Sequence, residues 1–276
     1  MMALGDAQDR TNHSSKADTV VSRASLWQVA RTCQESVRGC QSSDNGCHLT
    51  QKLRIGQIEQ TSNVCYIPSM PHLLIATGNP GKTREYERLL APLPLTLCTP
   101  RDLGLALKIQ ESGRTHFENA RIKALAYQRA SGLWTLADDS GLEVDALEGR
   151  PGLHSARYGR PLADDVQRYR LLLQELAAVP WAQRTARFRC VIVLALPIRE
   201  TYHTEGCCEG LIALKPQGDR GFGYDPIFYL PDHGQTMSQL APEVKNRISH
   251  RARAAQEMLP ILKQLLAGPT TAAGEN

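Results

Sequence analysis

The chain has 276 residues, of which 42% are hydrophobic and 22% charged, and its formal net charge is +4. This length allows one large domain or two small ones. The charge is too small to indicate a nucleic-acid-binding protein, because such proteins concentrate basic residues on one face. The sequence has no run of about 18 uncharged apolar residues, so we expect no membrane-spanning helix. It also has no secretory signal and no CxxC pair, and we therefore expect a cytoplasmic protein with reduced cysteines.

Residues 1–69 differ in composition from the rest of the chain. They are rich in Ser, Gln, Asn, Asp and Thr and have no sustained apolar period. Such a segment buries too little apolar surface to offset the entropy lost on ordering. We expect residues 1–69 to be a disordered or dispensable extension, apart from a short helix around Ala24–Arg31. Our hypothesis is that the functional chain starts at Met70, that the folded domain spans 70–268 and that 269–276 form a flexible tail.

Strand and helix signals alternate from Leu73 onward. In chain order we expect a strand at Leu73–Ala76, a helix at Lys82–Leu90, a strand at Leu95–Cys98, a helix at Thr115–Ala130, a short strand at Trp134–Ala137, a helix at Asp164–Ala178, the longest strand at Ala186–Leu196, a strand pair or long bent strand at Thr201–Leu214, a short strand at Pro226–Leu230 and a helix at Ser249–Leu266. Thr115 is the N-cap of its helix, and Glu118 completes a capping box. This order predicts an α/β domain with a long, partly antiparallel sheet.

The first candidate site is Thr77-Gly78-Asn79-Pro80-Gly81-Lys82, between a strand and a helix. Backbone N–H groups and the helix dipole favour phosphate at such a point, and Lys82 adds a positive charge. The alternative is a tight turn with an exposed lysine. A Walker A element is disfavoured, because Ala76 stands where that motif requires its first glycine and Pro80 lacks an N–H group.

The second candidate site is Asp138-Asp139-Ser140-Gly141, which follows the short strand Trp134–Ala137. Adjacent side chains at a strand end point in different directions, so only one carboxylate need face a ligand. That carboxylate could hold Mg²⁺, which prefers one or two carboxylates together with phosphate oxygens. The alternative is a turn capped by Asp and Gly. Glu111 is a second candidate carboxylate, although a solvated loop residue would look the same.

The third candidate site is Gly221–Pro226. Two glycines flank Phe222 and leave one face of its ring free to stack on a base. Asp225 precedes a proline, so we expect it to be extended and to accept hydrogen bonds. The alternative is a β-turn with a core phenylalanine.

The fourth candidate site contains Lys245, His250 and Arg251 at the start of the last helix. Lys245 and Arg251 could bind phosphate or a purine carbonyl, and arginine presents a planar fork of donors. The alternative is a set of solvated charges at a helix start.

Seven stretches in this order resemble the inosine triphosphate pyrophosphatases, also called the Ham1 family. They are ATGNPGK (Ala76–Lys82), FENA (Phe117–Ala120), ADDSG (Ala137–Gly141), PGLHSARY (Pro151–Tyr158), ARFRC (Ala186–Cys190), GFGYDP (Gly221–Pro226) and ISHR (Ile248–Arg251). The resemblance runs from about Leu73 to Leu266. It implies a two-lobed α/β domain around a long mixed central sheet with flanking helices, with the active site in the cleft between the lobes.

The resemblance also implies an activity, a cofactor and a partner. The implied reaction is Mg²⁺-dependent hydrolysis of ITP, dITP, XTP and dXTP between the α and β phosphates. Its products are the monophosphate and pyrophosphate, and its role is to cleanse the nucleotide pool. A homodimer is implied, with no nucleic-acid or membrane partner.

Carried over residue by residue, the resemblance assigns each candidate a role. The loop residues Thr77, Asn79 and Lys82, with Gly78, Pro80 and Gly81 between them, would bind the triphosphate. Asp139 would act as the general base and share Mg²⁺ with Glu111, and Ser140 would be a further substrate contact. Phe222 would stack on the base, in a pocket shaped by Gly223, Tyr224 and Asp225. Lys245, His250 and Arg251 would close over the nucleotide, with Arg251 donating to the 6-oxo group. The Glu111 assignment is the least direct, because family members often have two acidic residues where this chain has Gln110-Glu111.

A nucleotide- or RNA-binding module without catalysis is the alternative from another class. The pair Asp138-Asp139 beside candidate phosphate-binding residues argues against it, because an anion-binding site gains nothing from buried acids without a metal.

Overall fold

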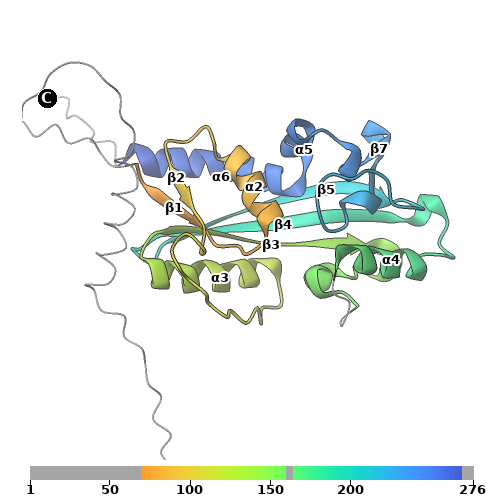
Figure 1. Cartoon of the computed structure of the whole chain (residues 1–276), viewed down its shortest axis with the longest axis horizontal. Helices are drawn as coiled ribbons and strands as arrows, with labels where there is room; N and C mark the ends of the chain where they lie inside the picture. The colour runs from red at the N-terminus through yellow and green to blue at the C-terminus, as the bar shows by residue number, and fades with distance from the viewer. Residues whose placement is uncertain (1–69, 160–163, 269–276) are drawn as a thin grey trace, which may run out of the picture. The chain divides into compact units, whose positions relative to one another are not determined.

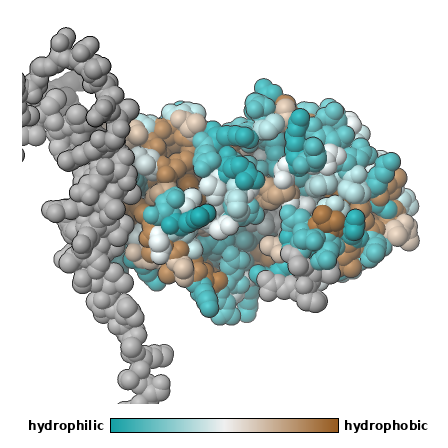
Figure 2. Space-filling model, viewed as in Figure 1, coloured by the Kyte–Doolittle hydropathy of each residue, from teal (hydrophilic) through white to brown (hydrophobic). Residues whose placement is uncertain are grey.

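The computed structural model describes residues 70–159 and 164–268. The expectations for residues 1–69, including the helix at Ala24–Arg31, and for residues 269–276 lie outside this described part. Within it, no helix has both the length and the apolar character needed to cross a bilayer. Hydrophilic residues cover most of the face seen in Figure 2, and hydrophobic residues reach it in scattered patches.

A seven-stranded mixed sheet forms the centre of the domain (Figure 1). Its strands are β1 (His72–Ile75), β2 (Thr96–Cys98), β3 (Trp134–Val144), β4 (Thr185–Ala195), β5 (Thr201–Ile212), β6 (Phe228–Leu230) and β7 (Gln235–Thr236). They lie in the order β2-β1-β3-β4-β5-β6-β7. β1 is parallel to both of its neighbours, and every pair from β3 to β7 is antiparallel. The expected α/β class with a partly antiparallel sheet is confirmed.

Helices cover both faces of this sheet. They are α2 (Pro80–Leu89), α3 (His116–Ser131), α4 (Asp165–Glu175), α5 (Pro242–Ile248) and α6 (His250–Ala267). Successive residues of β4 alternate between two cores: Ile192 packs in a cluster with residues of α2 and α6, whereas Val193 packs in a cluster with alanines of α3. Figure 1 accordingly shows α3 on the opposite side of β3 and β4 from α2 and α6. This alternation places helices from distant parts of the sequence over the same strands.

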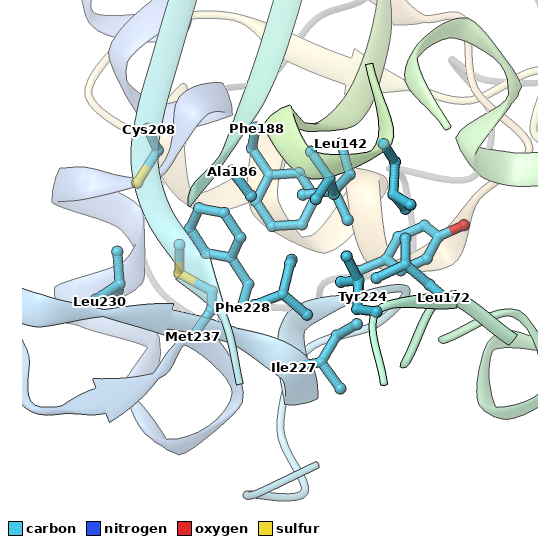
Figure 3. Packing of buried hydrophobic residues seen from close by; sticks show 14 of the residues in the cluster. Leu142, Leu172, Ala186, Phe188, Cys208, Tyr224, Ile227, Phe228, Leu230 and Met237 are labelled. Carbon is cyan, nitrogen blue, oxygen red and sulfur yellow. The ribbon is translucent and has the colours of Figure 1, made fainter. Parts of the chain in front are cut away.

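A third core cluster surrounds the other end of β3 and β4 (Figure 3). The rings of Phe188 and Phe228 lie 4.5 Å apart between their centroids. Leu172 of α4 and Tyr224 of the Gly221–Pro226 loop join the same cluster. The core therefore fixes the loop that carries the third candidate site.

Three sequence-based expectations are wrong in detail. β3 does not end at Ala137 but continues to Val144, because β4 pairs with it along the whole length. The strand at Ala186–Leu196 is not the longest: β4 has 11 residues, whereas Thr201–Leu214 forms one long strand, β5, of 12 residues, in agreement with the second of its two alternatives. The capping box of α3 is incomplete: the Thr115 hydroxyl accepts from the Glu118 N–H, but the Glu118 carboxylate accepts from Arg114 instead of Thr115.

Arg184 ties the end of α4 to the sheet. Its guanidinium is buried, 4% exposed, and donates to the carbonyl oxygens of Leu176 at 2.7 Å and Val179 at 3.0 Å. A third bond of 3.4 Å reaches the carbonyl of Ala213, just after β5. These bonds join the C-cap of α4, the segment after it and the end of β5 through one buried guanidinium.

Replacing Arg184 by Met is expected to lower the free energy of unfolding by roughly 3 kcal/mol, because buried carbonyls lose a charged donor. Urea unfolding followed by circular dichroism measures the change. The matched control is Arg170→Met, at an exposed position of α4, for which we expect a change below about 0.5 kcal/mol. Equal effects of the two substitutions would contradict the assigned role.

Candidate active site

The four candidate sites meet at one cavity of about 390 Å³. The predicted residues that line it are Thr77, Gly78, Asn79, Lys82, Glu111, Asp139, Ser140, Phe222, Gly223, Tyr224, Asp225, Lys245, His250 and Arg251. Pro80 and Gly81 are absent from the lining and form the first turn of α2 instead. The tertiary structure thus brings together segments that span more than half of the chain.

The loop between β1 and α2 is held mainly by its own side chains. Asn79 is the N-cap of α2, and its Oδ1 accepts from the N–H groups of Gly81 at 2.8 Å and Lys82 at 3.3 Å. The Thr77 hydroxyl accepts from the N–H of Asn79 at 3.1 Å. Our expectation that these backbone N–H groups would be available for phosphate is therefore corrected. The loop offers a ligand the ammonium group of Lys82 and the positive end of the helix dipole.

Asp138 and Asp139 lie in the middle of β3, so their side chains project to opposite faces of the sheet. Asp138 is 2% exposed, and its Oδ2 lies 2.9 Å from Lys82 Nζ and 3.1 Å from Arg251 Nε. Burial alone would raise the pKa of Asp138, but Lys82 and Arg251 hold it well below its ordinary value. Asp138 is therefore ionised, and its charge is balanced by two cations.

Asp139 has different partners. Its Oδ2 lies 2.7 Å from Nδ1 of His116, the first residue of α3. It lines the cavity, whereas Asp138 does not. In the described part of the chain, no lysine or arginine lies within ion-pair distance of Asp139. As expected, only one of the two adjacent carboxylates faces the cavity. The two lie in the middle of β3, however, and not at a strand end.

A chain of alternating charges runs along the cavity, and four of its six members line it. In order, it contains Lys82, Asp138, Arg251, Glu85, Lys245 and Asp225, with three cations and three carboxylates. Glu85 of α2 stands at its centre, 2.5 Å from Arg251 Nη1 and 2.8 Å from Lys245 Nζ. Burial would raise the pKa of Glu85, but the two cations lower it overall. Sequence reasoning missed Glu85, whose position three residues after Lys82 on one helix face was the available signal.

Lys245 lies between two carboxylates of this charge network, Glu85 and Asp225. Its Nζ lies 2.5 Å from Asp225 Oδ2, and these partners raise the pKa of Lys245 despite its burial. Burial raises the pKa of Asp225, although Lys245 opposes the shift. Asp225 is not extended as expected but begins a short 3₁₀ turn, where its carboxylate accepts from the N–H of Phe222 at 2.9 Å. That bond holds the loop in its turn.

Phe222 is half-buried at the cavity and belongs to none of the core clusters. The alternative of a core phenylalanine is therefore wrong. Its ring lies against Gly81, where an added Cβ would be 2.4 Å from a ring carbon. Lys245 Nζ is 4.9 Å and Arg251 Cζ 5.7 Å from the ring centroid. Gly81 thus allows α2, the two cations and an aromatic ring to share one small volume.

His250 is 5% exposed, and its ring stacks on Phe188 at 4.7 Å. Burial, with the charges of Arg251 and Lys245, holds its pKa well below the ordinary value, so the ring is neutral. Its Nδ1 has no hydrogen-bond partner in the described structure.

Glu111 and Asp139 place two carboxylates on the cavity wall. Lys123 of α3, which sequence reasoning also missed, lies 2.7 Å from Glu111 Oε1 and donates to the backbone carbonyl of Asp138 at 3.0 Å. The described residues contain no cluster of three or more His, Cys, Asp or Glu side chains that could hold a metal alone. Two carboxylates fit Mg²⁺, which takes its remaining ligands from water and substrate phosphates.

Asp138→Asn is expected to lower the free energy of unfolding by roughly 3–5 kcal/mol at pH 7, because Lys82 and Arg251 would remain buried without their shared carboxylate. The folded pKa of Asp138 lies below its unfolded value, so its stabilisation is complete above about pH 4 and is lost as pH falls further. The difference from wild type should therefore shrink below that pH. Urea unfolding between pH 3 and 8 measures it, with Asp232→Asn at an exposed position as control. A difference that is independent of pH would contradict this assignment.

Comparison with known proteins agrees with the geometry. The model of the Ham1 family matches residues 73–261. A dITP/XTP pyrophosphatase of Geobacillus kaustophilus is 47% identical over 199 residues, which cover 72% of this chain and 98% of that protein. The corresponding protein of Bacillus subtilis is 43% identical over 194 residues, covering 70% of this chain and 98% of its own length.

Solved structures give the same result. A HAM1 protein from Coxiella burnetii is 38% identical with a TM-score of 0.65, and the match covers 71% of this chain and 100% of that protein. The Staphylococcus aureus Ham1 protein is 37% identical with a TM-score of 0.62, covering 70% and 99% of the two chains. With the family model matching more than half of the sequence, this chain belongs to the Ham1 family.

Proposed function

We propose that this chain is a nucleoside-triphosphate pyrophosphatase that hydrolyses ITP, dITP, XTP and dXTP to the monophosphate and pyrophosphate. Relatives named dITP/XTP pyrophosphatase match it over nearly their whole length. The observation that carries the proposal is that the two adjacent carboxylates have different surroundings. Asp138 forms ion pairs with Lys82 and Arg251, whereas Asp139 faces the cavity and has no lysine or arginine partner among the described residues. The role of such an enzyme is to cleanse the nucleotide pool.

The phosphate end of the cavity has to offset several negative charges. Lys82 presents its ammonium group there, with Thr77 and Asn79 beside it. Asp138 fixes Lys82 at 2.9 Å, so its position is set before substrate arrives. A preorganised charge stabilises the transition state without having to reorient during the reaction.

Asp139 is the proposed general base. It aligns a water molecule and accepts one of its protons as the water oxygen bonds to the α-phosphorus, and the bond to the pyrophosphate oxygen breaks. Asp139 and Glu111 are the residues that would hold Mg²⁺, a cofactor that neutralises phosphate charge and makes bound water more acidic. Glu111 Oε1 forms an ion pair with Lys123 Nζ at 2.7 Å, and this ion pair holds the Glu111 carboxylate at the cavity wall.

The base end of the cavity suits an uncharged ring. The six charges of the ion-pair network sum to zero, and Phe222 supplies an aromatic face beside them. The Nε, Nη1 and Nη2 groups of Arg251 donate hydrogen bonds to Asp138, Glu85 and Ser140, respectively. These bonds use three of the five N–H groups of the guanidinium. We infer that a remaining N–H donates to the purine 6-oxo group. A 6-amino group in its place would leave donors facing each other, at a cost of roughly 1–3 kcal/mol for each unpaired buried group.

We also propose that residues 70–268 form the catalytic domain, that the enzyme is a cytoplasmic homodimer and that neither nucleic acid nor membrane is a partner. The alignment supports the domain limits, since 98% of the Geobacillus relative corresponds to 72% of this chain.

The deciding experiment supplies the full chain and Mg²⁺ with ITP, XTP, dITP, GTP or ATP and follows pyrophosphate and orthophosphate separately. We expect pyrophosphate from ITP, dITP and XTP, with little from ATP. Orthophosphate as the first product would indicate a phosphatase, and an absence of turnover would indicate a binding protein. The same assay on residues 70–268 tests the domain limits.

Asp139→Asn is expected to lower kcat for ITP at least about a thousandfold, because the amide cannot accept the proton. Nucleotide affinity, measured by isothermal titration calorimetry, should change far less because Lys82, Phe222 and Arg251 are untouched. Asp232→Asn serves as the matched exposed control. A substantially active Asp139→Asn enzyme would rule out Asp139 as the base.

A further inference from the structure

His116 occupies an unexpected place behind the proposed base. It is 9% exposed, and its Nδ1 lies 2.7 Å from Asp139 Oδ2. It does not line the cavity, whereas Asp139 does. The imidazole thus contacts a cavity-lining carboxylate without lining the cavity itself. Among the described residues, Asp139 has His116 as its side-chain hydrogen-bond partner.

The chain provides a closely fitted space for this ring. Thr115 caps α3 and places His116 at its first helical position. On β3, Gly141 has no side chain, and an added Cβ there would lie 2.9 Å from His116 Cε1 and 2.3 Å from the carbonyl oxygen of Gly152. The glycine of the Asp138–Gly141 stretch therefore leaves room for the imidazole beside Asp139.

The chemistry of this contact differs from that of the neighbouring carboxylate. Lys82 and Arg251 balance the charge of Asp138. An imidazole that donates Nδ1–H to Asp139 fixes one carboxylate oxygen, and this ring does so from outside the cavity lining. The carboxylate therefore loses rotational freedom. A fixed orientation suits a group that must align a water molecule and take its proton.

We propose that His116 is a positioning residue for Asp139: its Nδ1–H holds Oδ2 so that Oδ1 is directed to the attacking water. The proposal rests on the proposed function, because it assigns Asp139 the role of base. It adds a residue that none of the sequence motifs identified and that does not line the cavity. It also requires Nδ1 to carry a proton, because Asp139 Oδ2 is then the acceptor.

Two substitutions separate positioning from packing. His116→Phe keeps an aromatic ring but removes the N–H donor, and we expect kcat for ITP to fall about 10- to 100-fold, with KM nearly unchanged. His116→Asn places an amide N–H the same number of bonds from Cβ as Nδ1, so it should restore most of the lost kcat. Retention of full kcat in His116→Phe would overturn the proposal. Equal losses in both variants, with unfolding free energies like that of wild type, would also overturn it.

A spectroscopic measurement on the full chain is independent of turnover. With protein labelled with ¹³C and ¹⁵N, the His116 ring signals are assigned through bonds from its backbone amide, and their coupling pattern reports which ring nitrogen carries the proton. We expect the Nδ1–H form in the wild type and a changed pattern in Asp139→Ala, which removes the acceptor. An Nε2–H form, or signals unaffected by Asp139→Ala, would overturn the contact even if both His116 variants failed to fold. A wild-type enzyme that releases no pyrophosphate would instead refute the proposed function and leave this measurement to judge the contact.

Discussion

The site depends on the antiparallel pairing of β3 with β4. Because β4 holds β3 in extended conformation from Thr135 to Val144, consecutive side chains at Asp138 and Asp139 must leave the sheet on opposite faces. One carboxylate enters a network of cations contributed by α2 and α6. The other meets an imidazole from α3 at the cavity wall. Two chemically identical neighbours acquire different electrostatic surroundings from strand geometry alone.

The buried network explains how so much charge can lie beneath one cavity. Isolated buried ions are strongly destabilising, but each ion here has an opposite charge within hydrogen-bond distance. Glu85 is essential to this arrangement, because it separates Arg251 from Lys245, two cations that would otherwise repel each other. The network holds its donors in fixed positions, and a site that binds a polyanion benefits from charges that need no rearrangement.

Small residues set the spacing of this machinery. Gly81 lets the ring of Phe222 approach α2, and Gly141 lets the ring of His116 approach β3. At Gly221 the backbone has a φ of +79°, and an added Cβ would lie 2.0 Å from Asp225 Oδ2. Each of these glycines lies inside a motif seen in the sequence. A side chain is excluded there because it would collide with a residue far away in the sequence or across a turn.

Local sequence was sufficient for features whose physical cause is local. The N-cap at Thr115 follows from hydrogen bonding over a few residues, and the strand at Leu73–Ala76 from a short apolar run. Such features were predicted to within a few residues. The motif positions also supplied fourteen of the residues that line the cavity, although Pro80 and Gly81 do not line it and Lys123 was missed. Errors arose where a partner from elsewhere decided the outcome: β3 continued past Ala137 because β4 pairs with it, and the backbone donors at Gly81 and Lys82 were taken by Asn79.

The sequence by itself determined the family resemblance, the fold class and the candidate residues, because each depends on residue identity and order. Only the tertiary structure decided which charges pair. Lys123 and His116 have no distinctive local pattern, and Glu85 has only its spacing from Lys82. Each gained its role through a partner on another element, up to 166 residues away in the case of Glu85 and Arg251. Ion pairing and burial are properties of the assembled sheet and helices, so no local reading of the chain contains them.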